Sequence, residues 1–151
     1  MPEPIHPQLS AALHGGPSKR PFTGLDFSVN ANPSGPNPAL LRAVRDADHV
    51  HYPDPGHHAL RASLGHWHSL DVACVVPAVG ASELLHRLVR AYLRPADRVL
   101  SVLAPFGEFR RAVTLAGGRL EVVQPDRATG AVRPGVKLIY LGHPHNPTGR
   151  S

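Results

Sequence analysis

Several features that would point to particular classes of protein are missing from this sequence. It has 151 residues and a single cysteine, Cys74, so an internal disulfide and a cysteine-based metal site are excluded. No run approaches the roughly 20 apolar residues that cross a bilayer. The start, Met-Pro-Glu-Pro-Ile-His-Pro, lacks the basic and apolar regions of a signal peptide. These absences predict a soluble, cytoplasmic protein that does not span a membrane.

Lysine is also scarce, although the chain carries a net charge of +5. Only Lys19 and Lys137 stand among the 16 basic residues, and the others are arginines spread along the chain. Nucleic-acid-binding surfaces usually combine a basic cluster with aromatic residues between the charges. The densest pairs here, Arg42/Arg45 and Arg110/Arg111, fall in segments with helical spacing. We therefore interpret the charge as a solvated basic surface and expect no nucleic-acid partner.

The first half of the chain is interrupted by many glycine and proline residues. Residues 1 to about 24 carry no sustained periodicity and predict an irregular arm. A short extended segment is expected over 25–29. Asn37 followed by Pro38 is typical of a helix start, because Asn caps free amides and Pro fits the first turn. A second helix is expected from about residue 57 to 66.

From residue 72 onward the pattern becomes regular, and strands alternate with helices. The strands expected from short, β-branched apolar runs are 72–77, 98–103, 120–123 and 136–141. The helices expected from a 3.6-residue period are 80–93 and 106–116, the second closed by Gly117-Gly118. This alternation predicts βαβ units, a mainly parallel sheet and an α/β fold.

Two loops stand where ligands bind in such sheets, beyond the carboxyl ends of the strands. The small residues of 78–82 would let the amides of a helix N-terminus approach a phosphate. An ordinary tight connection would use the same residues, and no Gly-Lys-Ser/Thr follows as in a nucleotide P-loop. The second loop, 142–149, holds Asn146 between two prolines. Such stiffness suits a side chain that must be placed accurately, but a plain turn would also use it.

The second loop also carries a motif. Asn146-Pro147-Thr148-Gly149, with Pro144 before it, resembles the Asn-Pro-x-Asn-Pro-Thr-Gly motif of class I/II aminotransferases, the fold-type-I pyridoxal-phosphate enzymes. Four further segments resemble, in the family's order, its substrate loop, Tyr-Pro-Asp element, phosphate-binding turn and Pro-Thr-Tyr/Phe segment: 26–35, 52–54, 79–83 and 104–109. The sequence departs from these family motifs at three positions, Val79, Ala104 and Pro105. The sequence is similar to the histidinol-phosphate aminotransferase and threonine-phosphate decarboxylase branches, and His14-Gly15-Gly16 favours the second.

The resemblance implies a fold, a cofactor and roles for particular residues. It implies a three-layer α/β/α domain, with 1–50 as an arm and small-domain segment and 51–151 as the first half of the cofactor-binding large domain. The cofactor is pyridoxal 5'-phosphate, and the substrate is a small amino compound. The residues expected to contact the cofactor are Gly80, Ala81 and Ser82 at its phosphate, Phe106 on its ring and Asn146 at its 3-oxygen. Tyr52 would reach the other subunit's phosphate in a homodimer, and His14 and Asn32 would lie near the substrate.

The resemblance also implies what these 151 residues do not contain. In the family, the lysine that forms a Schiff base with the cofactor, the aspartate at the pyridine nitrogen and the carboxylate-binding arginine follow the Asn-Pro-Thr-Gly loop. Neither Lys19 nor Lys137 stands at that position. We expect no catalytic residue and no transamination or decarboxylation by these residues alone. A family sheet of about seven strands would keep four, with an exposed edge strand. Marginal stability, aggregation or dependence on a second polypeptide should follow.

Two alternative hypotheses about the function stay open. The first is a non-catalytic fragment or paralogue that binds a phosphate ligand or a complementing chain. The second is a histidine-based metal protein, since the chain has 11 histidines, among them His57/His58 and His66/His68. Helical metal ligands are expected at i and i+4, and these two pairs are farther apart. We therefore predict no metal site.

Overall fold

The computed structural model describes residues 24–25, 29 and 32–151. Most of the predicted arm and of the extended segment 25–29 lie outside the described residues. The described chain divides into two compact units, and the division falls between Pro77 and Ala78. The predicted division near residue 50 concerns the domains of the full-length family fold and stays a prediction.

The described part of the unit that ends at Pro77 contains two α-helices. Helix α1 (Pro38–Arg45) begins as predicted, because the Asn37 side chain accepts a hydrogen bond from the Ala39 amide (2.9 Å). None of its residues is buried, and its apolar side chains Leu40 and Val44 are about two-thirds exposed at 65% and 63%. Helix α2 (His58–His68) is also present, two residues longer than predicted at its end.

Asp54 holds the start of α2. One of its carboxylate oxygens accepts the Gly56 amide (2.9 Å), and the other accepts both the His58 amide (2.7 Å) and His58 Nδ1–H (2.8 Å). These bonds satisfy donors that the first turn leaves free. Because hydrogen bonds from the His58 and Gly56 amides favour the ionised carboxylate, they lower the pKa of Asp54 to about 2.

The strand predicted over 72–77 is wrong. Residues Val72–Cys74 form a short 3₁₀ helix, η2, whose start is capped by the Asp71 carboxylate accepting the Ala73 amide (2.7 Å). Arg61 of α2 binds η2 and the residue after it, because its guanidinium donates to the Val72 carbonyl (2.8 Å) and the Val75 carbonyl (3.0 Å). Arg61 therefore takes carbonyls that a sheet neighbour would otherwise bind, and the β-branched run alone does not make a strand.

The second unit, residues 78–151, contains a parallel three-stranded sheet. Its strands are β1 (Arg98–Val102), β2 (Arg119–Val123) and β3 (Val136–Leu141), in the order β2-β1-β3. The α/β class is confirmed, and the strands starting near 98, 120 and 136 were predicted. The described sheet has three strands and not four because 72–77 does not join it.

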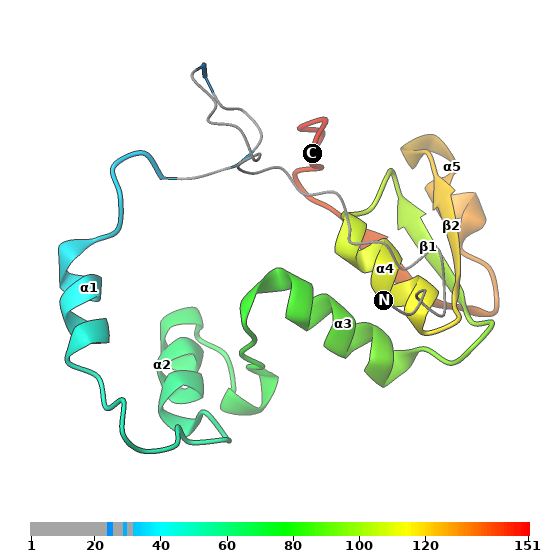
Figure 1. Ribbon diagram of the computed structural model, residues 1–151. Coiled ribbons are helices and arrows are strands. Elements are labelled where there is room, and N and C mark those ends of the chain that lie inside the picture. The colour runs from blue at the N-terminus through cyan, green and yellow to red at the C-terminus, as the bar shows by residue number, and fades with distance from the viewer. Residues whose placement is uncertain (1–23, 26–28, 30–31) are drawn as a thin grey trace, which may run out of the picture. The chain divides into compact units, whose positions relative to one another are not determined.

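Helices cover both faces of this sheet (Figure 1). Helices α3 (Gly80–Tyr92) and α4 (Gly107–Leu115) pack on each other and on one face. The core there consists of apolar side chains from α3, α4 and β1: Val89, Leu93, Val99, Phe109, Ala112 and Val113. The opposite face is contacted by α5 (Pro125–Ala131). The sequence did not predict α5, because it is one short helix that contains Pro125 and Gly130.

The predicted end of α4 at Gly117-Gly118 is confirmed. Gly117 has a positive φ of 70°, and the Gly118 amide returns to the Val113 carbonyl (2.9 Å). A residue in this left-handed conformation followed by a returning amide is a common helix ending, and glycine adopts it without strain.

β3 pairs with β1 on one side, and on the other side no strand of the described chain pairs with it. β3 is therefore an edge strand of the described sheet, as β2 is. Its side chains Ile139 and Leu141 lie on the face opposite Leu138 and are 48% and 67% exposed. That a family strand is missing from this edge stays a prediction.

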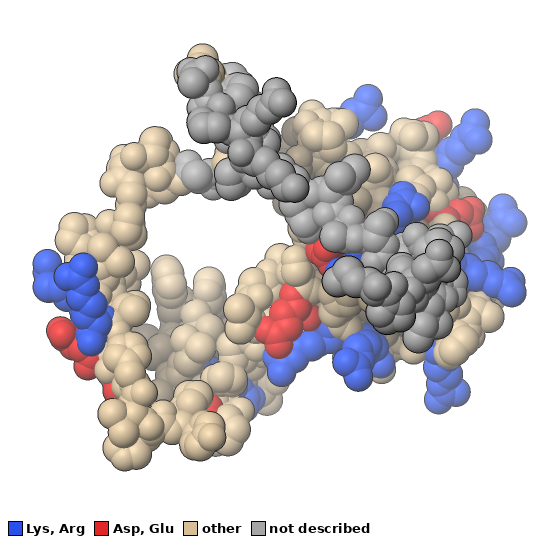
Figure 2. All heavy atoms as spheres, viewed as in Figure 1, with Lys and Arg blue, Asp and Glu red and all other residues tan. Residues whose placement is uncertain are grey.

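Lys and Arg side chains are distributed around the second unit in Figure 2, and they do not gather into one patch on the face shown. Among the described residues, no helix is long and apolar enough to cross a membrane.

Candidate functional site

A pocket of about 340 Å³ lies at the carboxyl edge of the sheet. The chain leaves β1 and β3 at this edge, and α3 and α4 begin next to it. The lining residues come from those four segments: Ala81, Leu84, Leu85, Ala104, Phe106, Tyr140, Gly142, Pro144, His145 and Asn146. The edge that α/β sheets use for ligands therefore carries both loops that the sequence singled out.

The start of α3 forms one wall of the pocket. Gly80 has a positive φ of 80°, and no atom lies within 4 Å of the position that a Cβ would occupy. The Val79 amide donates to Glu83 Oε2 (2.5 Å), and Glu83 Oε1 lies 3.4 Å from Arg87 Nε. The Glu83 charge is thus engaged within the helix itself. The Gly80 amide donates to the Ala78 carbonyl (2.9 Å), and the next amides of the first turn have no intrahelical acceptor.

Phe106 forms a second wall, immediately before α4, and its side chain is partly accessible at 39%. Tyr140 of β3 also lines the pocket, and its ring stacks on the buried Phe109 with centroids 4.4 Å apart. The aromatic side of the pocket is therefore supported from the hydrophobic core. An apolar surface of this kind suits a flat ring.

The loop after β3 forms the third wall. His145 is 5% exposed, whereas its neighbours His143, Pro144 and Asn146 are exposed. The peptide bonds before Pro144 and Pro147 are cis. The Asn146 side chain is available to the pocket with both a donor and an acceptor.

A cluster of charged side chains joins α3 and α4 near this site. Glu108 is 7% exposed and accepts a hydrogen bond from His86 Nε2 (3.0 Å). Arg111 Nη1 lies 3.7 Å from the same carboxylate. The pair His86–Glu108 thus fixes the two helices whose first turns border the pocket.

The predicted cofactor residues fall into two groups. Ala81, Phe106 and Asn146 line the same pocket, and Gly80 and Ser82 flank Ala81 in the first turn of α3. Their proposed contacts stay predictions.

The other predicted residues belong to the chain before the second unit. Tyr52 is 98% exposed in the first unit. Asn32 is used locally, because its side chain accepts the Ser34 amide (3.0 Å) and donates to the Gly35 carbonyl (3.1 Å). His14 lies outside the described residues. The roles of all three stay predictions.

Sequence reasoning missed His145, Tyr140 and the leucines of α3 as pocket residues. Tyr140 carried a signal, since alternate residues of β3 face the same side as the core residue Leu138. No sequence pattern indicated that His145 lines the pocket, because its burial depends on residues distant in sequence.

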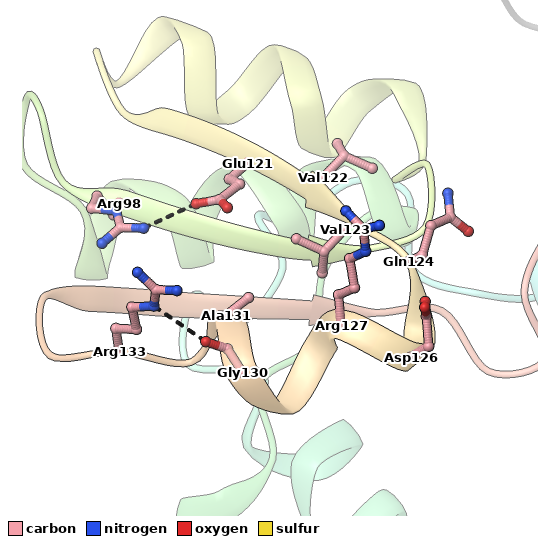
Figure 3. A pocket seen from close by; sticks show the side chains of 10 residues that line it. All are labelled: Arg98, Glu121, Val122, Val123, Gln124, Asp126, Arg127, Gly130, Ala131 and Arg133. Atoms are coloured by element: carbon pink, nitrogen blue, oxygen red, sulfur yellow. Dashed lines mark hydrogen bonds and ion pairs between the residues drawn. The ribbon is translucent and has the colours of Figure 1, made fainter.

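A larger pocket of about 610 Å³ lies beside β2 and α5 (Figure 3). Its arginines are partly engaged: Arg98 Nη2 bonds Glu121 (2.9 Å), and Arg133 Nε bonds the Gly130 carbonyl (3.2 Å). None of the predicted site residues lines it. The smaller pocket is therefore the candidate site. In the part of the chain that the structure describes, no group of three histidine, cysteine or acidic side chains could hold a metal ion.

The parallel α/β sheet and the motif-bearing loops at its carboxyl edge are typical of the aminotransferase class. The profile of the family described as aminotransferase class I and II matches residues 23–151. The chain belongs to this family.

Two relatives show the closeness of the match. The histidinol-phosphate aminotransferase of Jannaschia sp. (strain CCS1) is 35% identical in an alignment 164 positions long, gaps included, which covers 97% of this chain and 45% of the relative. The crystal structure of the Sinorhizobium meliloti histidinol-phosphate aminotransferase in complex with pyridoxal-5'-phosphate superposes with a TM-score of 0.68 at 31% identity, over 76% of this chain and 34% of that one.

A third match extends the fold likeness. The L-threonine-O-3-phosphate decarboxylase of Porphyromonas gingivalis has a TM-score of 0.57 at 21% identity, over 72% of this chain and 33% of that chain. The chain spans less than half the length of the curated relatives that it matches. The family resemblance and the fold that it implied are thereby confirmed.

Proposed function

We propose that this chain supplies the phosphate and ring contacts of a pyridoxal-phosphate-dependent aminotransferase. The observation that carries the proposal is that Ala81, Phe106 and Asn146 line one and the same pocket at the carboxyl edge of the sheet. These three come from three segments far apart in sequence. Each belongs to one of the family motifs identified in the sequence.

The residues of the pocket fit such a cofactor. The first turn of α3 offers amides and the positive end of a helix dipole to a phosphate. Ser82 adds a hydroxyl, and the acidic Glu83 is occupied by Val79 and Arg87. Phe106 offers a partly accessible ring face, and Asn146 a side chain that can bond a ring oxygen.

When bound, pyridoxal phosphate withdraws electrons from the substrate's Cα bonds. The residues described here would hold and orient it: Ala81 and Ser82 at the phosphate, Phe106 against the ring, Asn146 at the 3-oxygen. Lys137 lies at the start of β3, the end of the strand away from the pocket. The described residues of the pocket would thus supply binding and orientation of the cofactor, and Lys137 would not reach it.

The substrate class that we propose is a phosphorylated amino compound of the histidinol-phosphate type. The curated relatives at 35% identity are described as histidinol-phosphate aminotransferases, and this favours amino transfer. The His14-Gly15-Gly16 segment favours a threonine-phosphate decarboxylase, an enzyme of cobalamin biosynthesis, as the second candidate. A non-catalytic phosphate-binding paralogue is the third.

We further propose a homodimer in the cytoplasm. The family resemblance implies that Tyr52 contacts the partner's cofactor, and its almost complete exposure leaves the ring available for a second chain. Sedimentation of the wild type and of Tyr52→Ala, with and without cofactor, tests whether Tyr52 contributes to association.

Binding of pyridoxine 5'-phosphate, which has no aldehyde, tests the proposed function without covalent attachment to surface lysines. We expect saturable binding by titration calorimetry, competed by inorganic phosphate and weakened about tenfold or more by Phe106→Ala or Asn146→Ala. Tyr92→Ala is the matched control, because Tyr92 is a 66%-exposed aromatic residue at the other end of α3. Absence of binding by the wild type would refute the proposal for this chain.

A further inference from the structure

His145 is the most buried residue of the loop after β3, and it faces away from solvent although the loop is exposed on both sides of it. A buried imidazole must have its polar nitrogens satisfied, or its burial costs stability. Both ring nitrogens of His145 have partners, and the partners lie in two different segments.

The partners determine where the ring proton lies. Nε2 is 3.0 Å from the Ala104 carbonyl, which can only accept, so Nε2 carries the hydrogen. Nδ1 is 2.7 Å from Thr148 Oγ1, whose hydroxyl can donate to it. The backbone of His145 closes the loop on itself, since its carbonyl accepts the Gly149 amide (2.6 Å) and its amide donates to the Arg150 carbonyl (2.7 Å).

The hydrogen bond from His145 to Ala104 joins two walls of the pocket, the Phe106 wall and the loop after β3. Ala104 lies two residues before Phe106, and His145 is directly followed by Asn146. The two residues are 41 positions apart in sequence, and this side-chain hydrogen bond ties together loops that follow two different strands. Displacement of either loop would therefore change the separation of the Phe106 ring and the Asn146 amide.

We propose that His145 is a positioning residue: its Nε2–H···O bond to Ala104 holds the Asn146 loop at a fixed distance from the Phe106 wall. The inference rests on the proposed function for the identity of the ligand between the walls. It assigns to His145 no contact with that ligand's reacting atoms. Its effect is to hold the site in its binding geometry before the ligand arrives.

Two conservative substitutions separate the two ring bonds. In His145→Gln the side-chain amide nitrogen can stand near the position of Nε2 and keep the donor to Ala104. In His145→Asn the side-chain oxygen stands near Nδ1 and keeps the Thr148 bond, but nothing reaches Ala104. His143→Asn is the matched control, because His143 is an exposed histidine of the same loop.

The affinity for pyridoxine 5'-phosphate, measured on variants shown by circular dichroism to be folded, tests the proposal. We expect His145→Asn to lose about tenfold or more, and His145→Gln and His143→Asn to stay within about threefold of the wild type. A purely structural role would lower the melting temperature of both His145 variants without this difference in affinity. Equal losses for Gln and Asn, or an unchanged affinity for Asn, would overturn it.

Measurements on the protein without ligand keep this test separate from that of the proposed function. Nitrogen-15 spectra of the wild-type ring should show the proton on Nε2; a proton on Nδ1 would overturn the inference. Amide exchange over 104–106 and 143–149 should be faster in His145→Asn than in His145→Gln. If the wild type binds no pyridoxine 5'-phosphate but these two results hold, the proposed ligand is wrong and the positioning role stands. If binding occurs and exchange is equal in both variants, the positioning role is wrong.

Discussion

Phe109 connects the hydrophobic core of residues 78–151 to the candidate site. Its side chain is 2% exposed in the cluster with Val89 and Val113, and its ring stacks on Tyr140 at a 27° angle. Tyr140 in turn lines the pocket. Substitution of Phe109 should therefore affect both the stability of the fold and the shape of the site.

The size of the effect follows from burial. Removing a fully buried phenyl group typically costs about 3–5 kcal/mol, which includes the cavity left behind. Aromatic stacking supplies about 0.5–1.5 kcal/mol of that. Since whole domains are stable by only about 5–15 kcal/mol, Phe109→Ala should leave this unit close to unfolding. Phe109→Leu keeps most of the volume and should cost about 1.5 kcal/mol.

Urea denaturation followed by circular dichroism measures these differences. Leu115→Ala is the control, because Leu115 lies on the same helix and is 50% exposed. We expect the order Leu115→Ala, Phe109→Leu, Phe109→Ala in increasing loss of stability. The reasoning is refuted if Phe109→Ala costs less than about 1 kcal/mol, since a core ring cannot be removed so cheaply.

Three further predictions concern other parts of the fold. The depressed pKa of Asp54, about 2 against an ordinary 3.8, stabilises α2 above roughly pH 4, and this contribution is lost as the pH falls toward 2. Asp54→Asn should flatten the acid-side dependence of helicity in that window, measured by circular dichroism against the wild type. Gly117→Ala should lower the melting temperature, at a cost of about 1 kcal/mol or more, because the added Cβ meets a positive φ and lies 3.3 Å from Pro95 Cβ. His86→Ala should cost about 1–3 kcal/mol in urea melts by leaving Glu108 with a weaker partner set, whereas the exposed His66→Ala should be neutral.

Local signals in the sequence predicted the elements that carry their own start and stop residues. Asn37-Pro38 and Gly117-Gly118 place helix ends that the structure confirms, because capping depends on neighbours in sequence. The run 72–77 looked like a buried strand, but a strand needs a partner, and Arg61 binds its carbonyls instead. Helix α5 was missed because Pro125 and Gly130 are typical of a turn.

The two loops of the candidate site could be predicted from the sequence, but their arrangement in space could not. The motifs indicated which residues would matter, and their meeting in one pocket depends on the pairing of β1 with β3. The burial of His145 depends on that same pairing, because Ala104 follows β1 and His145 follows β3. No pattern within a single segment encodes it.

The register of the two strands places the walls of the pocket at the same level. Val102 pairs with Leu141, the last residue of each strand, so both loops leave the sheet side by side. A shift of one residue would turn every side chain of β3 to the other face and take Tyr140 out of its stack on Phe109. The core packing of Tyr140 and Leu138 therefore selects the register, and the register brings the Asn146 loop beside Phe106. The sheet thus brings the two loops side by side, and the hydrogen bond from His145 to Ala104 then joins them directly.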